Sequence, residues 1–378
     1  MEKESVYKLL FKLLRVGLGL EQFSPTEVEV ISQTSQQVWS RVFSISQMHG
    51  ISALCYDAIK ELWQELKVPK MLFIQWTFST ENIEKQYNKR ISARTKLYEI
   101  LENGGLRFLE MKGEALAQYY PNPTHRVCTD IDIYLGDNYN EGLKIFDLNK
   151  VVYKKDSPRH DHVFINGIIV ENHLVLSEFR IRKSDVEIER ILQEQARISL
   201  GSDTEPGGVY PTDDFNAIFL PWHSSAHFMF ENIPLKQIVD WAIFLMKRGR
   251  FIEETLYRKC AQYSSGRVAD IITVIAIKQM GFDSKMFPDF IVKSSQSIDT
   301  KLTDRVYEYI ISPNRIKESS SNFLDRRIRR AREIWENRWK YSKVYKISLV
   351  TLYYRKAVWF IYDLFRYKKP YKNGEFKL

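Results

Sequence analysis

The chain has 378 residues, which is long for one compact domain, and its 44% hydrophobic content excludes global disorder. Three distant cysteines, Cys55, Cys128 and Cys260, exclude a disulfide framework and a CxxC metal site, which favours a reducing, cytoplasmic location. The net charge of +9 is concentrated in residues 321–378, which hold 16 basic and 5 acidic residues, whereas the charges of the other residues nearly balance. No uncharged apolar run reaches about 18 residues, so we expect no transmembrane helix.

The first hundred residues predict helices. Residues 1–20 have the pattern of an amphipathic helix and lack the apolar core and cleavage site of a signal peptide. The segment SPTEVEVI, which starts at Ser24, has a capping serine, a proline at the first helical position and a glutamate that completes a capping box. Residues 81–101 contain no proline or glycine, and the NGG that follows is typical of a helix end.

Strand patterns begin after this helix. LRFLEMKG, residues 106–113, predicts a strand that ends at a glycine, and EALAQYY, residues 114–120, predicts a short helix. TDIDIYL, residues 129–135, alternates with the period of two that is typical of a strand. Residues 201–214 are rich in glycine, proline and small polar residues, so we expect a linker or long loop there, followed by helices.

These patterns predict an α+β fold, with a small mixed sheet and flanking helices between two helical regions. We expect an N-terminal helical region over residues 1–80, a core over residues 81–200, and a C-terminal helical region with a basic, aromatic tail over residues 201–378.

Two acidic residues, Asp130 and Asp132, lie one residue apart in the strand TDIDIYL. Because side chains two apart on a strand share a face, both carboxylates point the same way. Adjacent anions repel one another and need a cation between them, and Mg²⁺ prefers carboxylate oxygens. The alternative is a strand end whose two acids simply face water.

The segment HVFINGIIVENHL, residues 162–174, predicts a β-hairpin with a type I′ turn at Asn166 and Gly167. Counting outward from this turn gives three cross-strand pairs: Ile165 with Ile168, His162 with Glu171, and His160 with His173. One carboxylate and three imidazoles therefore share a face of the hairpin. These histidines could also bind Zn²⁺, or they could form a purely structural network.

The central segments resemble the nucleotidyltransferase superfamily that includes polymerase β, and more closely a bacterial family of uncharacterised nucleotidyltransferases. The resemblance rests on LEMKGEALAQYYPNPTHRVCTDIDIYL, HVFINGIIVENHLVL and WHSSAHFMFENIPLKQIVDWAIFLMKRG, and it covers roughly residues 39–249. The superfamily pattern is a glycine turn, an Asp-x-Asp strand and a later strand with a third carboxylate. The residues in those places are Gly113, Asp130, Asp132 and Glu171.

The resemblance implies a metal-dependent enzyme that moves a nucleoside monophosphate from an NTP to an acceptor hydroxyl and releases pyrophosphate. It implies that Asp130, Asp132 and Glu171 are catalytic and bind Mg²⁺ or Mn²⁺, with Glu171 either a metal ligand or the base that activates the acceptor hydroxyl. It also implies a set of residues that bind substrate or phosphate: Lys112, Gly113, Arg126, His162, His173, His227, Lys236 and Asp240. The alternatives are a solvated Lys112, an Arg126 paired with a nearby acid, and ordinary helix-surface roles for the residues after position 220.

The sequence departs from the superfamily pattern at the turn, where Gly113 is followed by Glu114 instead of the common serine. This puts the usual serine contact with phosphate in doubt. The gap from the turn to Asp130 is also longer than in minimal transferases, and it contains Pro121 and Pro123.

Two other classes of function remain open. One is a catalytically silent nucleotidyltransferase-like scaffold that binds a nucleotide, a partner or a polyanion, and the other is a zinc-dependent hydrolase that uses the histidine cluster. The tail, residues 321–378, mixes cations with aromatic residues. Such a tail can bind a polyanion, lie on an anionic membrane surface, or pack its aromatic residues on the protein.

Overall fold

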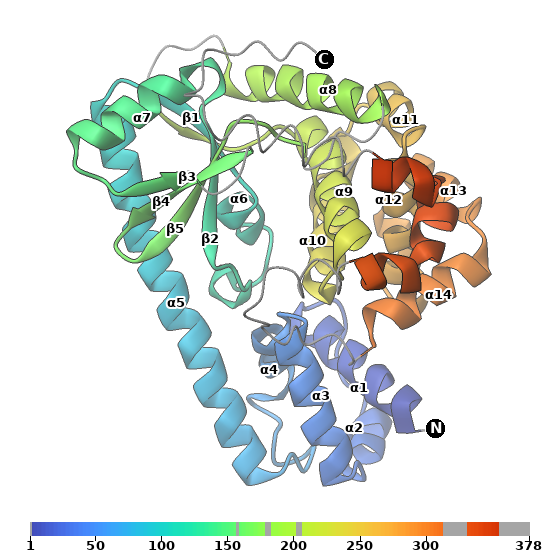
Figure 1. Ribbon diagram of the computed structural model, residues 1–378. Coiled ribbons are helices and arrows are strands. Elements are labelled where there is room, and N and C mark those ends of the chain that lie inside the picture. The colour runs from blue at the N-terminus through green and yellow to red at the C-terminus, as the bar shows by residue number, and fades with distance from the viewer. Residues whose placement is uncertain (1, 156–158, 178–182, 202–205, 313–330, 355–378) are drawn as a thin grey trace.

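The computed structural model describes the whole chain except residues 1, 156–158, 178–182, 202–205, 313–330 and 355–378. The described residues form a six-stranded mixed sheet with helices around it, which confirms the predicted α+β class (Figure 1). A long helix connects one side of the sheet to a group of N-terminal helices, and further helices pack beyond the other side (Figure 1).

The N-terminal helices are α1 (Glu2–Gly17), α2 (Pro25–Ser32), α3 (Gln36–Met48), α4 (Ser52–Ile59) and α5 (Lys70–Asn103). The capping box predicted at the start of α2 is confirmed, because the Ser24 hydroxyl and the Glu27 carboxylate accept each other's backbone N–H. Helix α5 begins well before the predicted residue 81. Its first turns hold aromatic residues of modest helix propensity, and burial stabilises them: Trp76 is fully buried and donates its indole N–H to the Ser52 carbonyl.

The strands are β1 (Arg107–Met111), β2 (Asp130–Tyr134), β3 (Tyr153–Lys155), β4 (His160–Ile165), β5 (Ile168–His173) and β6 (Gly207–Val209). Their order in the sheet is β3-β4-β5-β2-β1-β6. Strand β2 is antiparallel to β1 and parallel to β5. The short helix α6 (Gly113–Ala117) follows β1, and α7 (Tyr139–Leu148) follows β2.

The hairpin register predicted from the sequence is confirmed. Asn166 and Gly167 have φ values of 51° and 74°, as a type I′ turn requires, and the three predicted cross-strand pairs all occur. One face of the hairpin buries Val163, Ile165, Ile168 and Val170 against α5 and α7. The opposite face carries the histidines and Glu171, so the buried face fixes which side chains reach the other side.

Strand β6 lies inside the segment that was predicted to be a linker, so that prediction is wrong for residues 207–209. Gly207–Val209 pairs in parallel with β1. A Cβ at Gly208 would lie 2.2 Å from the ring of Tyr98 on α5, so only glycine lets the chain pass between the helix and the sheet edge. In the sequence alone, Gly207 and Gly208 suggest a turn. In the folded chain they permit close packing at the edge of the sheet.

The C-terminal helices are α8 (Lys183–Leu200), α9 (Asp213–Phe230), α10 (Leu235–Arg248), α11 (Glu254–Ala261), α12 (Ser264–Val274), α13 (Asp289–Gln296) and α14 (Thr300–Ile310). Shorter turns are η1 (Pro123–His125), η2 (Gly136–Asn138), η3 (Gly249–Phe251), η4 (Ile275–Gln279), η5 (Ser284–Met286) and η6 (Lys340–Val344). Helix α1 packs against this region: the Tyr7 hydroxyl donates to the Ile311 carbonyl at 2.9 Å.

Part of the basic tail lies in the described residues and packs on α9. The Lys340 ammonium donates to the carbonyls of Phe228 and Glu231 at 2.8 and 2.7 Å, and the Tyr345 hydroxyl donates to the Ser225 carbonyl at 2.6 Å. These contacts satisfy carbonyls at the end of α9. The rest of the tail, residues 321–330 and 355–378, lies outside the described residues. No helix in the described part is long and apolar enough to cross a membrane.

Candidate active site

A cavity of about 310 Å³ separates the polar face of the sheet from helices α9 and α10. Its walls include most of the residues predicted for the site: Lys112, Arg126, Asp130, Asp132, Glu171, His173, His227, Lys236 and Asp240. His160 also lines the cavity, although the sequence prediction did not include it among the site residues. Gly113 and His162 are not among the lining residues. Gly113 follows Lys112 in the chain, and His162 lies opposite Glu171 in the sheet.

The three predicted carboxylates come from two neighbouring strands. Asp132 on β2 is the register partner of Glu171 on the parallel strand β5, and Asp130 pairs with Ile169. Since register partners and residues two apart point to the same side, all three carboxylates project from one face of the sheet. Ligand atoms of Asp132, Glu171 and His173 lie within 4.8 Å of one another.

Asp132 is almost completely buried and contacts two nitrogen groups. The Lys112 Nζ lies 2.7 Å from its Oδ1, and the His173 Nε2 lies 3.0 Å from the same oxygen. The same His173 nitrogen lies 3.5 Å from Glu171 Oε2. Cationic groups therefore already balance part of the negative charge of the carboxylates.

The backbone of Lys112 is in an unusual conformation. Its φ is 50° and its ψ is −108°, in the left-handed half of the map that favours glycine. Such strain costs on the order of 1–3 kcal/mol and is concentrated at functional sites. Here it accompanies a sharp turn between β1 and α6 that points the lysine side chain to Asp132.

The pKa values of the aspartates move in opposite directions. Burial and then the charge of Asp132 raise the pKa of Asp130 above its usual value. Burial also acts to raise the pKa of Asp132, but the ammonium of Lys112 and the hydrogen bond from His173 outweigh it and hold that pKa well below the usual range. Asp130 is thus the carboxylate that lacks sufficient positive charge nearby.

The pKa values of the ionisable groups on the hairpin are also shifted. Burial opposes ionisation of His173, but its bonds to Asp132 and Glu171 prevail and raise its pKa to about 9. Burial likewise opposes ionisation of Glu171, and its bond with His173 lowers the pKa to about 2. Burial lowers the pKa of His160 to about 4, so this imidazole is neutral at physiological pH. At neutral pH the face therefore carries a charged His173 between two carboxylates.

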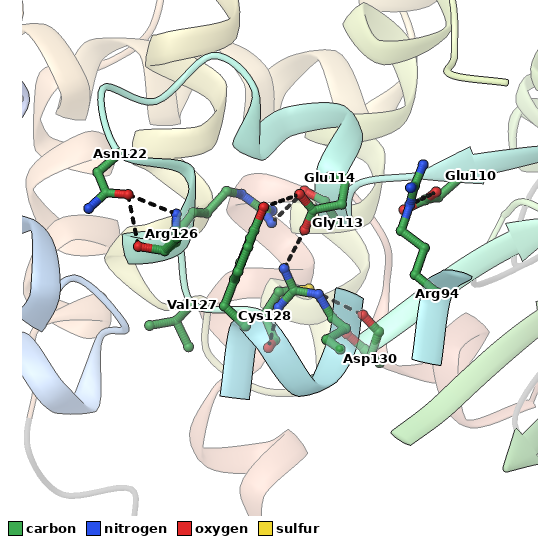
Figure 2. A network of polar contacts seen from close by, with 12 residues as sticks. Arg94, Glu110, Gly113, Glu114, Asn122, Arg126, Val127, Cys128 and Asp130 are labelled. Carbon is green, nitrogen blue, oxygen red and sulfur yellow. Dashed lines mark hydrogen bonds and ion pairs between the residues drawn. The ribbon is translucent and has the colours of Figure 1, made fainter. Parts of the chain in front are cut away.

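Arg126 forms a buried, two-point ion pair with Asp240 on α10. Its Nε and Nη2 lie 2.7 and 2.9 Å from the two carboxylate oxygens. Its Nη1 donates to the Gly113 carbonyl at 3.1 Å, and Figure 2 shows Arg126 beside the Gly113 turn. Asp240 also accepts a hydrogen bond from the Tyr120 hydroxyl at 2.6 Å. Pairing with a nearby acid was the alternative role expected for Arg126. The pair also connects the Gly113 turn to α10. Lys236, one turn before Asp240, donates to the Val127 carbonyl at 2.9 Å.

Glu114, at the position where the superfamily commonly has serine, binds to helix α5. Its carboxylate pairs with Arg90 and accepts a hydrogen bond from the Tyr87 hydroxyl at 2.9 Å. Arg90 also donates to the Cys128 carbonyl at 2.9 Å (Figure 2). Glu114 therefore stabilises the turn by connecting it to α5. No local sequence pattern indicates this pair, because Arg90 and Glu114 are 24 positions apart.

The wall opposite the carboxylates is formed by helix α9. The rings of His223 and His227 both line the cavity, 4.5 Å apart between centroids, and His227 Nδ1 lies 3.8 Å from Glu231 Oε2. The C-terminal segment that contains Lys340 and Tyr345 caps this end of α9. A distant part of the chain thus contacts the last turns of the helix that carries His227.

A glycine turn, an Asp-x-Asp strand and a third carboxylate on the adjacent strand, arranged in a mixed sheet, define a nucleotidyltransferase-type fold. The chain belongs to the uncharacterised nucleotidyltransferase family, whose family model matches residues 35–281. This match confirms the resemblance seen in the sequence. No curated protein and no solved structure matches the chain. Membership of the family supports a general role in nucleotidyl transfer.

Proposed function

We propose that this protein transfers a nucleoside monophosphate from an NTP to an acceptor hydroxyl and releases pyrophosphate. The observation that carries the proposal is the register of β2 and β5. It places Asp132 beside Glu171, with Asp130 on the same face, in a cavity that Lys112 also lines.

The residues present fit a hard divalent cation. Carboxylate oxygens are the ligands that Mg²⁺ and Mn²⁺ prefer. Burial and then the charge of Asp132 raise the pKa of Asp130, and a bound cation would favour its ionised form. Asp130, Asp132 and Glu171 would hold the cation. When bound, it would neutralise triphosphate charge and stabilise the oxygens that enter and leave at the α-phosphorus.

The low pKa of Glu171, about 2, bears on its role. A general base works best when its pKa lies near the operating pH, so this carboxylate is a poor proton acceptor. We therefore assign Glu171 to cation binding and not to activation of the acceptor hydroxyl.

Lys112 is the cation best placed to meet the triphosphate, because its ammonium lies in the cavity beside Asp132. Lys236 and His227 lie on the α9 and α10 side and would contact the same substrate. Arg126 and Asp240 hold the Gly113 turn in place. A Cβ at Gly113 would meet nothing nearer than 3.7 Å, so protein packing does not require glycine there, whereas close approach of a phosphate would.

The test is to incubate purified protein with each α-phosphate-labelled NTP, Mg²⁺ and a cell extract. We expect label on a discrete acceptor with the wild type and none with Asp130→Asn. Asp137→Asn is the matched control, because Asp137 is an exposed acid just after β2. Transfer by Asp130→Asn at the wild-type rate would refute the proposed site.

A catalytically silent scaffold is the second candidate, and the Lys112–Asp132 ion pair favours it, because an ammonium already contacts a carboxylate proposed to bind the cation. The two candidates differ in how NTP binding depends on metal. Calorimetric titration with and without Mg²⁺ separates them: binding that needs Mg²⁺ supports the enzyme, and equal binding without Mg²⁺ and without transfer supports the scaffold.

A further inference from the structure

Two imidazoles on β4 face the same carboxylate oxygen on β5. Glu171 Oε1 lies 3.7 Å from His162 Nε2 and 3.9 Å from His160 Nε2. The ligand atoms of these three residues all lie within 4.8 Å of one another. The cluster lies on the side of Glu171 away from Asp132, since the other oxygen, Oε2, is the one that faces His173.

We infer that His160, His162 and Glu171 bind a borderline divalent cation such as Zn²⁺ or Co²⁺, at a site separate from the one proposed for Mg²⁺ at Asp130 and Asp132. This inference does not depend on nucleotidyl transfer. Glu171 is the residue common to both sites, and each of its oxygens serves one of them.

The distances fit such a cation. With metal–ligand bonds of about 2.0–2.2 Å in a tetrahedral arrangement, neighbouring ligand atoms lie roughly 3.3–3.6 Å apart. The distances from Glu171 Oε1 to His162 and His160 exceed this range by only a few tenths of an ångström. All three side chains are partly exposed, between 13% and 23%, so small rotations can close the gap and solvent can reach the site.

The backbone holds the ligands in this arrangement. His162 pairs directly with Glu171 across the hairpin, and the type I′ turn at Asn166 and Gly167 fixes that register. His160 is two residues before His162 on the same face, and the two rings stack 5.2 Å apart at 22°. Preorganised ligands lose little conformational freedom when they bind a cation.

The donor set selects the type of cation. Two imidazole nitrogens and one carboxylate oxygen suit Zn²⁺, Co²⁺, Ni²⁺ or Cu²⁺, whereas Mg²⁺ prefers oxygen ligands throughout. Three protein ligands leave at least one coordination position open, and His160 lines the cavity. That position can take water or an oxygen of a molecule bound in the cavity.

The test uses full-length, untagged, metal-stripped protein titrated with Co²⁺ and followed by visible absorption. We expect one Co²⁺ per chain to give the strong absorption of a four- or five-coordinate, nitrogen-bound ion, whatever Co²⁺ the oxygen ligands of the aspartate site also take up. His160→Gln and His162→Gln should each weaken binding about 100-fold, and unchanged melting temperatures would show that they fold. The matched controls are His223→Gln, a histidine elsewhere in the cavity, and Asp130→Asn, and both should bind Co²⁺ as the wild type does.

X-ray absorption spectroscopy of the wild-type Co²⁺ complex adds a measurement that needs no variant. Two imidazole ligands in the first shell would support the site. A shell of oxygen ligands alone would overturn it, as would wild-type Co²⁺ affinity in both histidine variants. Loss of Co²⁺ binding in Asp130→Asn would also overturn it, because that result places the ion at the aspartates.

Discussion

Lys112 and Asp132 form an ion pair of 2.7 Å at the floor of the cavity, whereas Asp130, two residues before Asp132, has no comparable partner among the contacts described above. The sequence alone predicts that the two aspartates behave alike, because both belong to one Asp-x-Asp strand. The contacts of the folded chain give them different effects on stability.

We expect Asp130→Asn to raise the melting temperature at pH 7 and Asp132→Asn to lower it. The folded-state pKa of Asp130 is raised, so its ionised form costs stability at any pH above the usual value of about 4, and asparagine removes that cost. Asp132→Asn removes the carboxylate that Lys112 and His173 both contact, at a cost of about 2 kcal/mol. Both variants should lose transfer. Thermal melts without metal check the signs, and equal shifts for the two variants would contradict the assignment.

The Arg126–Asp240 pair should show strong coupling in unfolding measurements. Arg126→Met or Asp240→Leu alone leaves a buried charge without its partner and should cost about 3–5 kcal/mol. The double variant should lose much less than the sum of the two. Denaturant unfolding of the four proteins in this cycle measures the coupling. If Arg126 served only to bind phosphate, Arg126→Met would keep wild-type stability and weaken NTP binding instead.

The hairpin turn can be tested with a pair of glycines. Gly167→Ala and Gly19→Ala each place a Cβ at positive φ, 74° and 68°, so each should cost about 1 kcal/mol. Neither new Cβ meets a backbone atom within 4 Å; at Gly167 it meets only the end of the Lys89 side chain. Transfer should fall only in Gly167→Ala, because that turn sets the position of Glu171. An equal loss of transfer in both variants would contradict this role of the turn.

His125 should make stability depend on pH. Its Nδ1 lies 2.6 Å from an Asp57 oxygen and its Nε2 lies 2.9 Å from a Glu84 oxygen. Burial lowers the pKa of His125, but the two hydrogen bonds outweigh burial and raise it overall. A raised folded-state pKa gives stability that is complete below the unfolded value of about 6.5 and is lost as pH rises through the folded value.

The melting-temperature difference between wild type and His125→Gln should therefore shrink as the pH rises from 6 toward 9. His49 provides the control. Burial lowers its pKa to about 4, so in this range only the unfolded state, with a pKa near 6.5, takes up a proton. Wild type should therefore gain stability relative to His49→Gln as the pH rises from 6 and show no further change above about 7.5, which is the opposite trend. A constant difference for His125→Gln would show that folding does not change the pKa of His125, and a growing difference would show that the imidazole is neutral in the folded protein.

The features that the sequence predicted correctly depend on local rules. The positions of His162 and Glu171 follow from the two-residue turn, and the shared face of Asp130 and Asp132 follows from strand period. The features it missed depend on residues far apart in the chain. The Arg126–Asp240 pair spans 114 residues, and Gly208 on strand β6 lies against Tyr98 of α5. No local pattern encodes such contacts.

The hydrogen bond from Tyr7 to the carbonyl of Ile311 has a consequence for synthesis on the ribosome. Its two residues are 304 positions apart, so helix α1 leaves the ribosome, and can pack on α3 and α4, long before its partner near residue 311 exists. At roughly 5–20 residues per second the delay is on the order of 15–60 s. Throughout that time Tyr7 and Phe11 of α1 lack Tyr307, the ring that both contact in the folded chain. We expect nascent chains shorter than about 310 residues to engage holding chaperones through this helix.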